Sequence, residues 1–297
     1  MTNLALVGNC QTWPLSEMFV HACADIDVIG KIVVYKSTED DEKTDMAILE
    51  NADIILSQLI TDTFTIPYIQ TTKLKSLFGD KVITVPNLFF HGQNPDQFYV
   101  YGENRVRILG PCGEYHSKSL IESWKAGRPV DEISGYNYIS ANFDNEYISS
   151  LVEKSFSDFS SRENAIDIPM GDYLRAHWQE QRLFHTFNHP TPAAIKALFI
   201  RFCKYAGISH DEQKLDEVSK NDRLGAIHPP MEITLSEKMG MKFSILKEIK
   251  GIGLDEETGA RIDGEYKQYS FSEYVEKSYR CYDLNRDFMN SLSFTPS

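Results

Sequence analysis

Short apolar runs alternate with longer segments of mixed polarity over the first 85 residues of the chain. Four of these runs are rich in Val, Ile and Leu and predict strands at residues 3–7, 28–35, 53–57 and 81–85. Apolar residues at helical spacing predict helices in the segments between them, at residues 13–24, 40–51 and 65–78. This alternation predicts an α/β fold in which an open, parallel, doubly wound sheet carries helices on both faces.

The character of the chain changes near residue 94. A segment rich in Gly, Pro, Asn and aromatic residues holds one short predicted strand, at residues 106–109. Helical patterns then dominate, at residues 115–126, 130–139, 144–159, 170–180, 192–205 and 271–289, and the segment 207–264 is less regular. We therefore predict an α/β region at 1–113 and a mostly helical region at 114–297, packed together as one unit.

The predicted sheet has a defined ligand-binding edge. In doubly wound sheets, ligands bind beyond the carboxyl ends of the strands. Three polar segments fall at that edge: Gly8 to Gln11 after the first strand, Gln58 after the third, and Pro86 to His91, which includes Asn87, after the fourth. We expect these segments to be neighbours in the folded chain.

Composition and charge narrow the classes of partner. The contents of 42% hydrophobic and 25% charged residues are ordinary for a soluble globular protein, and the net charge of −13 without a dense Lys/Arg block argues against a nucleic-acid partner. The first apolar segment has no basic flank and all apolar runs are short, so neither a signal peptide nor a membrane span is expected. Five scattered cysteines without a CxxC pair favour a reducing cytoplasm over a disulfide framework or a zinc site. The oligomeric state is left open.

Cys10 is the sharpest candidate for chemistry. It follows Gly8 and Asn9 at a predicted strand-to-helix turn, where the field of the helix N-terminus would favour a thiolate and lower the pKa of the thiol. Free backbone N–H groups of the same turn could stabilise an oxyanion. The alternative is that Cys10 is a small core residue, the role that we assign to the other four cysteines.

A cysteine nucleophile needs a base, and His189 is the leading candidate. It precedes Pro190 and a predicted helix start, a boundary where an imidazole can be fixed in orientation. His91 is the competing candidate, at the sheet edge. His185 and His189 are four residues apart, which is also the spacing of two metal ligands on a helix, but the proline disfavours a helix there and we predict no metal site.

Uncharged polar side chains are predicted around the thiol. Asn9, Gln11, Gln58 and Asn87 are amides of the kind that an oxyanion hole or the binding of sugar hydroxyl groups requires, beside Gly8 in the turn. The alternative for each is a turn or capping role.

Three sequence motifs carry a family resemblance. They are Val7-Gly8-Asn9-Cys10-Gln11, then Arg162-Glu163 with Asp167-Ile168 and Tyr173-Leu174, and finally Phe184-His185-Thr186-Phe187-Asn188-His189-Pro190. Together they resemble the WcbI family of bacterial capsular-polysaccharide biosynthesis proteins, regarded as acetyltransferases that bind coenzyme A and modify a capsule sugar. The resemblance covers the first two thirds of the chain. It implies Cys10 and His189 as the reactive pair, with His185 and Asn188 of the last motif as candidates for substrate binding.

A looser similarity links the same turn to SGNH hydrolases. In that fold a Gly-Asp-Ser turn after the first strand bears the nucleophile, and here Gly8-Asn9-Cys10 takes its place, with Asn87 similar to the oxyanion asparagine. The chain departs from the pattern three residues before His189, where Thr186 stands instead of Asp.

These resemblances imply an acyltransferase, acting from a small-molecule acyl donor, coenzyme A or acetyl-CoA, to a saccharide hydroxyl. Two mechanisms stay open: Cys10 forms an acyl-enzyme, or His189 activates the sugar hydroxyl for direct attack. Coenzyme A carries several phosphate charges, and the candidate cations for them are Lys31, Lys36, Arg162, Arg175, Arg182 and Lys196. The alternatives are a cysteine-dependent esterase or deacetylase, and a non-catalytic subunit that binds a carbohydrate or a nucleotide.

Overall fold

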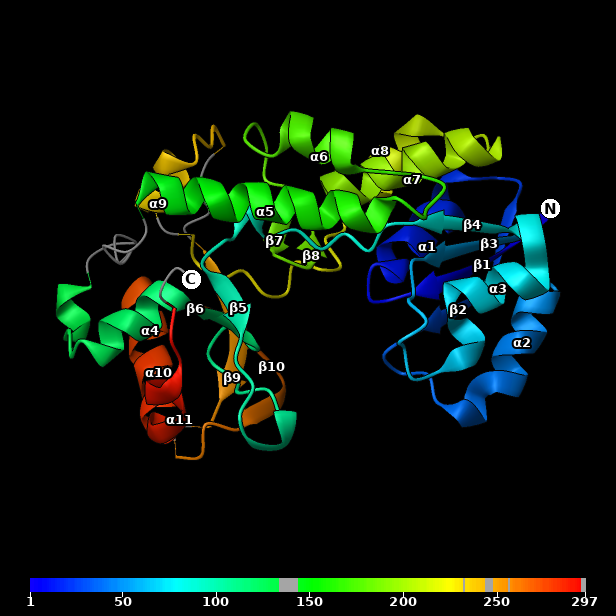
Figure 1. Ribbon diagram of the computed structural model, residues 1–297. Coiled ribbons are helices and arrows are strands. Elements are labelled where there is room, and N and C mark those ends of the chain that lie inside the picture. Colours follow the sequence, from blue (N-terminus) through cyan, green and yellow to red (C-terminus); the bar gives the residue numbers. More distant parts are fainter. Residues whose placement is uncertain (134–143, 232, 244–247, 256, 295–297) are drawn as a thin grey trace. The chain divides into compact units, whose positions relative to one another are not determined.

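The chain folds into two compact units in a computed structural model that describes residues 1–133, 144–231, 233–243, 248–255 and 257–294 (Figure 1). Unit 1 comprises residues 1–89, 157–176 and 189–224, and unit 2 comprises residues 90–156, 177–188 and 225–297. The units interleave along the sequence, and the predicted boundary between residues 113 and 114 falls inside unit 2. Each unit is described by itself below.

Unit 1 is built on a parallel four-stranded sheet with strand order β2-β1-β3-β4. Its strands are β1 (Thr2–Gly8), β2 (Ile26–Val33), β3 (Ile54–Gln58) and β4 (Val82–Val85). Its helices are α1 (Thr12–Ala22), α2 (Glu42–Glu50), α3 (Thr71–Phe78), α6 (Gly171–His177), α7 (Pro192–Ala206) and α8 (Glu212–Val218), α6 ending one residue beyond the unit. The two-residue strand β8 (His189–Pro190) precedes α7, and α5 (Asn145–Glu163) contributes its last turns to this unit.

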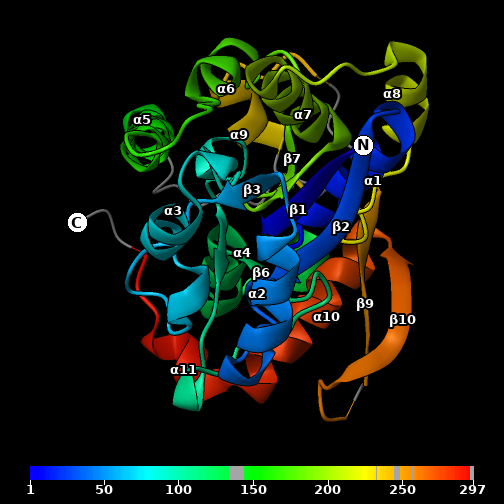
Figure 2. The ribbon, with the colours of Figure 1, turned by 90° about the vertical axis from the view of Figure 1, so that its right-hand side faces the viewer.

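The sheet of unit 1 is covered on both faces, as the alternation of strands and helices predicts. Ala5 and Val7 of β1 belong to one buried cluster with Leu49 of α2 and Leu74 of α3. The alternate residues of β1 are also buried and face the opposite side of the sheet, where α1 packs (Figure 2). The strand order places β2 on one side of β1 and β3 on the other, so the chain reverses its direction across the sheet at β1. The junction between β1 and β3 is therefore the switch point, where such folds bind ligands.

Unit 2 combines small antiparallel sheets with helices. Strand β5 (Gln97–Tyr99) pairs with β6 (Tyr115–Ser117), and β9 (Ile249–Leu254) pairs with β10 (Arg261–Tyr269). The other elements are β7 (Phe184–Thr186), α4 (Lys118–Lys125), α9 (Ile233–Lys238), α10 (Phe271–Leu284), α11 (Arg286–Ser291) and most of α5. Single 3-10 turns over the two units lie at Glu39–Asp41, Pro67–Ile69, Gly79–Lys81, His91–Gln93, Glu103–Arg105 and Val130–Glu132.

The predicted fold class, α/β with a parallel sheet in the N-terminal part and a mostly helical C-terminal part, is confirmed. The strand predicted at residues 106–109 is wrong, because that segment makes an isolated bridge through Arg107 to Tyr101 and no strand. The helix predicted at 271–289 is interrupted at Asn285, whose backbone is not helical (φ −121°, ψ 32°). Part of the helix predicted at 130–139 lies outside the described residues. Among the helices that are described, none has the length and apolar character needed to span a bilayer.

Candidate active site

The turn that carries Cys10 joins β1 to α1 and leaves no space for a side chain at Gly8. A Cβ on Gly8 would lie 2.6 Å from Oε1 of Gln58, the last residue of β3. Glycine therefore lets the Gln58 side chain cross the end of β1 and reach the backbone of the turn. Because β1 and β3 are adjacent parallel strands, this crossing lies at the switch point of the sheet.

Gln58 holds the turn from β3 with both ends of its amide. Its Oε1 accepts a hydrogen bond from the N–H of Asn9 (2.8 Å), and its Nε2 donates to Oε1 of Gln11 (2.8 Å). Asn9 in turn accepts from the N–H of Gln11 through its own Oδ1 (2.9 Å). Gln11 and Gln58 are buried, so these bonds also satisfy groups that water cannot reach.

Asn87, two residues after β4, completes this network. Its Oδ1 accepts from Nδ2 of Asn9 (2.9 Å) and from Nε2 of Gln11 (3.2 Å). Gln11 also bonds to both backbone groups of Leu88, donating to its carbonyl (2.9 Å) and accepting from its N–H (3.1 Å). Because two donors meet the oxygen of Asn87, its Nδ2 is turned away from the network. This half-buried side chain thus offers an oriented N–H donor to a ligand.

The structure thus brings together the four amides that the sequence places at the strand ends, with Cys10 in the same turn. We refer to Asn9, Gln11, Gln58 and Asn87 as the amide network. Because these residues bond to one another or to the turn, the structure directly shows their turn-fixing role, and the Nδ2 of Asn87 makes none of the network's bonds.

Cys10 is half-buried, and the other four cysteines are buried. Burial raises the pKa of the Cys10 thiol to about 11, although the N–H groups of Cys10 and Gln11 act in the opposite direction. The predicted lowering of this pKa is therefore wrong. The loss of hydration of the charged form outweighs the dipoles of the turn, and Cys10 is a neutral thiol at pH 7.

His189 lies in the same unit, directly ahead of α7, and α7 packs against α1. The rings of Phe19 and Phe199 lie 4.8 Å apart, and each is about two turns into its helix. One turn further on, the thiols of Cys23 and Cys203 shift each other's pKa in opposite directions, which places these two side chains close together. The two helices therefore run in the same direction, so their N-terminal ends lie on the same side. His189 precedes α7 and the Cys10 turn precedes α1, so both lie at that side. A hydrogen bond between that thiol and His189 stays a prediction.

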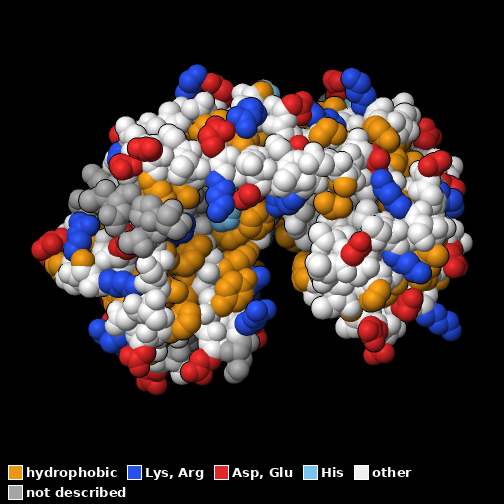
Figure 3. Space-filling view, in the orientation of Figure 1, with side chains coloured by type: hydrophobic (Ala, Val, Ile, Leu, Met, Phe, Trp, Pro, Cys, Tyr) orange, Lys and Arg blue, Asp and Glu red, His pale blue; other side chains and the backbone are white. Residues whose placement is uncertain are grey.

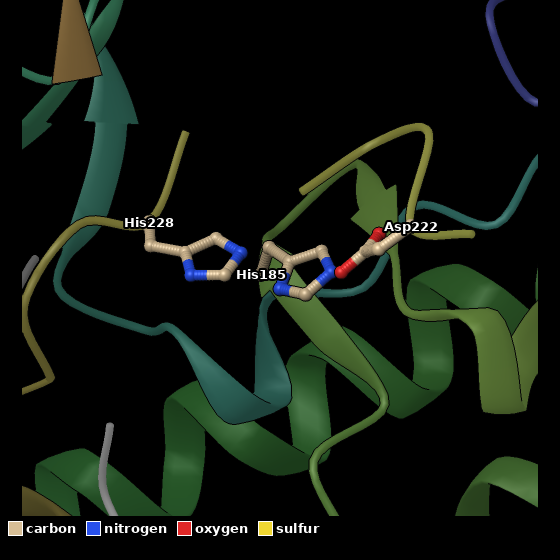
Figure 4. Close-up of side chains that lie close together, drawn as sticks. All are labelled: His185, Asp222 and His228. Carbon is tan, nitrogen blue, oxygen red and sulfur yellow. The ribbon is translucent and has the colours of Figure 1, made fainter. Parts of the chain in front are cut away.

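His185, Asn188 and Arg182 belong to unit 2, so their part in a site at Cys10 also stays a prediction. His185 is buried and stacks on His228, with ring centroids 4.2 Å apart and planes 17° apart (Figure 4). Asn188 accepts from the hydroxyl of Tyr115 (2.7 Å) and donates to that of Tyr99 (2.7 Å). Within unit 2, His185 and Asn188 are thus built into packed aromatic surroundings.

Comparison with known proteins identifies the family. The model of the family described as polysaccharide biosynthesis enzyme WcbI matches residues 3–211 of the chain. The chain belongs to the WcbI family. Its match includes the Cys10 turn, the amide network and His189, and a search of curated proteins finds no match.

A solved structure of WcbI, described as a novel polysaccharide biosynthesis enzyme, shares the fold of this family member. The two chains are 16% identical with a TM-score of 0.70, and the match covers 98% of this chain and 91% of the other. That structure is described as native protein without a disulfide bond between CoA and one of its cysteines. Membership of this enzyme family supports a role in polysaccharide biosynthesis.

Three of the cations expected to bind phosphate have separate local partners in this WcbI family member. Nη2 of Arg162 donates to the carbonyl of Phe89 (2.5 Å), Lys196 pairs with Asp216, Arg182 bonds to backbone carbonyls in unit 2, and Arg175 is exposed on α6. On the face shown in Figure 3, Lys and Arg side chains are scattered among Asp and Glu and do not form one basic patch. Their role toward coenzyme A remains a prediction.

Tyr35 is a neighbour of the thiol that sequence reasoning overlooked. Burial and, in second place, the sulfur of Cys10 raise the pKa of the Tyr35 phenol, which puts the two side chains within electrostatic reach. Tyr35 lies just beyond β2, at the same carboxyl edge as the other site segments. Its position at the end of the strand predicted at residues 28–35 is the signal that points to it.

Proposed function

We propose that this WcbI family member transfers an acyl group, most simply acetyl, from coenzyme A to a saccharide hydroxyl in the biosynthesis of a bacterial surface polysaccharide. One observation carries the proposal: a thiol at the switch point of an α/β sheet, in a turn fixed by the amide network. A rigid turn of this kind can hold a reacting sulfur and its oxyanion donors in one geometry.

Two donors are suited to a tetrahedral oxyanion at this turn. The N–H of Cys10 lies beside its own sulfur, where it favours negative charge. The Nδ2 of Asn87 is directed away from the network by the two bonds to its Oδ1. Both groups are oriented before a substrate arrives, so they cost little reorganisation during the reaction.

The raised pKa of Cys10 requires a base for covalent catalysis. In that route His189 takes the thiol proton as the Cys10 sulfur attacks the thioester carbonyl, and the bond to the coenzyme A sulfur breaks. His189 returns the proton to the departing sulfur and then removes one from the saccharide hydroxyl, which attacks the acyl-cysteine. The Cys10 sulfur leaves and regains that proton, so the enzyme is restored.

Direct transfer uses the same residues without an acyl-enzyme. His189 then removes the proton of the saccharide hydroxyl as this oxygen attacks the thioester, while Cys10 N–H and Asn87 Nδ2 hold the oxyanion. When the oxyanion collapses, the bond to the coenzyme A sulfur breaks and His189 gives its proton to that sulfur. A neutral Cys10 thiol would contact the substrate without bonding to it. The two routes differ in whether an acetylated Cys10 accumulates when no acceptor is present.

Coenzyme A supplies an activated acyl group, and the thioester end of that molecule fits a site of this donor chemistry. The description of the solved WcbI structure relates CoA to a cysteine of that protein. In this chain Cys10 is the half-buried cysteine, whereas the other four are buried. Cys10 is therefore the thiol to which we assign the reaction.

The test follows release of the coenzyme A thiol from acetyl-CoA with and without a panel of saccharide acceptors. We expect acceptor-dependent release that falls at least about 100-fold in His189→Gln by either route, and about 10- to 1000-fold in Asn87→Ala; the covalent route predicts a fall of at least about 100-fold in Cys10→Ala, and direct transfer a smaller one. Asn51→Ala is the matched control, because Asn51 is exposed and its Nδ2 bonds to the carbonyl of Ala47 away from the site.

The alternatives give different results in the same experiment. Hydrolysis of an acetylated sugar without any affinity for coenzyme A would contradict the transferase and identify a deacetylase. Full activity in Cys10→Ala would remove Cys10 from the chemistry. Binding of a carbohydrate or nucleotide with neither activity would indicate a non-catalytic subunit.

A further inference from the structure

Three exposed side chains flank the Cys10 turn and are not used by the mechanism. Trp13 on the first turn of α1 is 44% exposed, and Tyr35 beyond β2 is 60% exposed. Lys36 is also exposed, and its ammonium lies 5.4 Å from the centroid of the Trp13 ring. We refer to Trp13, Tyr35 and Lys36 as the aromatic platform.

The backbone keeps these residues beside the turn. The N–H of Trp13 donates to the carbonyl of Cys10 (3.2 Å). Trp13 is therefore held in the same backbone turn as Cys10, three residues further along the chain. At the end of β2, the N–H of Val34 donates to the carbonyl of Gly8 (2.9 Å), which places Tyr35 next to the same turn. The platform therefore comes from two elements that converge on the candidate nucleophile.

We propose that the aromatic platform is the acceptor subsite and that it binds a pyranose bearing a carboxylate, such as a uronic acid. The inference rests on the proposed transferase function. An exposed indole offers a flat apolar surface for the C–H face of a sugar ring, and Tyr35 adds a second ring with a hydroxyl. The ammonium of Lys36 would then pair with the carboxylate of the sugar.

The position of the platform favours the acceptor over the acyl donor. The attacking hydroxyl must come within bonding distance of the acyl carbon, so the acceptor ring has to lie next to the thiol. In coenzyme A, by contrast, the whole pantetheine arm separates the adenine and phosphates from the thioester. The chain carries a net charge of −13, so an anionic acceptor also needs a local cation, and Lys36 supplies one.

The test measures binding of methyl glucuronide and methyl glucoside to the whole protein by saturation-transfer NMR. Both sugars should bind the wild type, the glucuronide more tightly. Trp13→Ala should weaken both by about tenfold. Lys36→Gln, which keeps the side-chain length, should weaken the glucuronide by about two- to fivefold and leave the glucoside unchanged.

Trp124→Ala provides the matched control, because Trp124 lies in unit 2, where its indole N–H bonds to Asp283 (3.1 Å). Binding of both sugars should be unchanged in this variant. Failure of either sugar to bind the wild type, or equal binding by Trp13→Ala, would overturn the proposal. Loss of coenzyme A affinity in Trp13→Ala or Lys36→Gln, with sugar binding intact, would overturn it too, since the platform would then serve the donor.

Calorimetry with coenzyme A on the wild type separates this proposal from the proposed function. If the platform variants lose the sugars but the wild type binds no coenzyme A, the transferase fails and the saccharide site stands. If the wild type binds coenzyme A and transfers acetyl groups while Trp13→Ala keeps the KM for the acceptor, the transferase stands and the subsite fails.

Discussion

Gln58 should control both the stability of unit 1 and the position of Cys10, and Gln58→Ala removes both of its hydrogen bonds to the turn. The N–H of Asn9 then loses its acceptor, and Oε1 of Gln11 loses its shorter bond while the longer bond from Leu88 (3.1 Å) remains. A buried polar group left without its partner costs about 1–3 kcal/mol. The complete loss at the N–H of Asn9 and the partial loss at Oε1 of Gln11 together predict a decrease of about 2–4 kcal/mol in the free energy of unfolding.

The catalytic effect of Gln58→Ala should exceed its effect on substrate affinity. Gln58 touches the turn rather than the reacting atoms, and a displacement of about 1 Å at a reacting centre can reduce kcat about 100-fold. We therefore expect a large fall in kcat for acetyl transfer under conditions where the variant is still folded. Urea denaturation followed by circular dichroism gives the stability, and thiol release from acetyl-CoA gives kcat.

Gln70→Ala is the control for Gln58→Ala, because Gln70 is a glutamine of the same unit that bonds to loop carbonyls of Asp62 and Phe64. It should cost about 1 kcal/mol or less and leave kcat unchanged. If Gln58→Ala were no more destabilising than Gln70→Ala and equally active, the amide network would not be what fixes the turn.

Three further predictions follow from particular contacts. Alkylation of Cys10 by iodoacetamide should keep accelerating up to about pH 11, and a plateau near pH 8.5 would contradict the raised pKa. Burial opposes ionisation of Asp167, but hydrogen bonds from Thr84 and Lys75 outweigh it and lower the pKa of this carboxyl group. Ionised Asp167 therefore stabilises the folded state above about pH 4, and this contribution is lost as the pH falls through the lower folded pKa. Asp167→Asn should therefore cost about 1 kcal/mol in urea denaturation at pH 7 and progressively less in acid, and a cost independent of pH would refute this. Diamide should oxidise the neighbouring thiols of Cys23 and Cys203 to a disulfide, seen by mass spectrometry as the loss of two hydrogens. Modification of the two cysteines separately, without a disulfide between them, would contradict the parallel packing of α1 and α7.

Much of unit 1 could be predicted from the sequence because its signals are local. Strands β1 to β4 are rich in Val, Ile and Leu and the helices between them have helical spacing, so element type follows from the pattern of apolar residues. The grouping of Gln58 and Asn87 with the Cys10 turn then follows from the parallel sheet, whose carboxyl ends share one edge. The sequence therefore predicts that these residues are neighbours, but not which hydrogen bonds they form.

Other features depend on distant parts of the chain and gave no local signal. The pKa of Cys10 is set by its burial in the folded chain, while the turn itself indicated the opposite direction. Strand β9 was missed because Gly251 and Gly253 weaken its apolar pattern. Gly251 is needed there because a Cβ would lie 1.8 Å from the carbonyl oxygen of Pro111, a contact that only the folded chain reveals.

Protection of Cys10 by coenzyme A probes the acyl donor and the Cys10 site in one experiment. The rate of Cys10 alkylation is measured by mass spectrometry at pH 9 with increasing coenzyme A, in parallel with Asn87→Ala. We expect saturating coenzyme A to slow alkylation of the wild type at least about tenfold, and Asn87→Ala to need a higher concentration for the same effect. If calorimetry shows that coenzyme A binds but the alkylation rate of Cys10 does not change, then the acyl donor binds away from Cys10 and the proposed site is wrong.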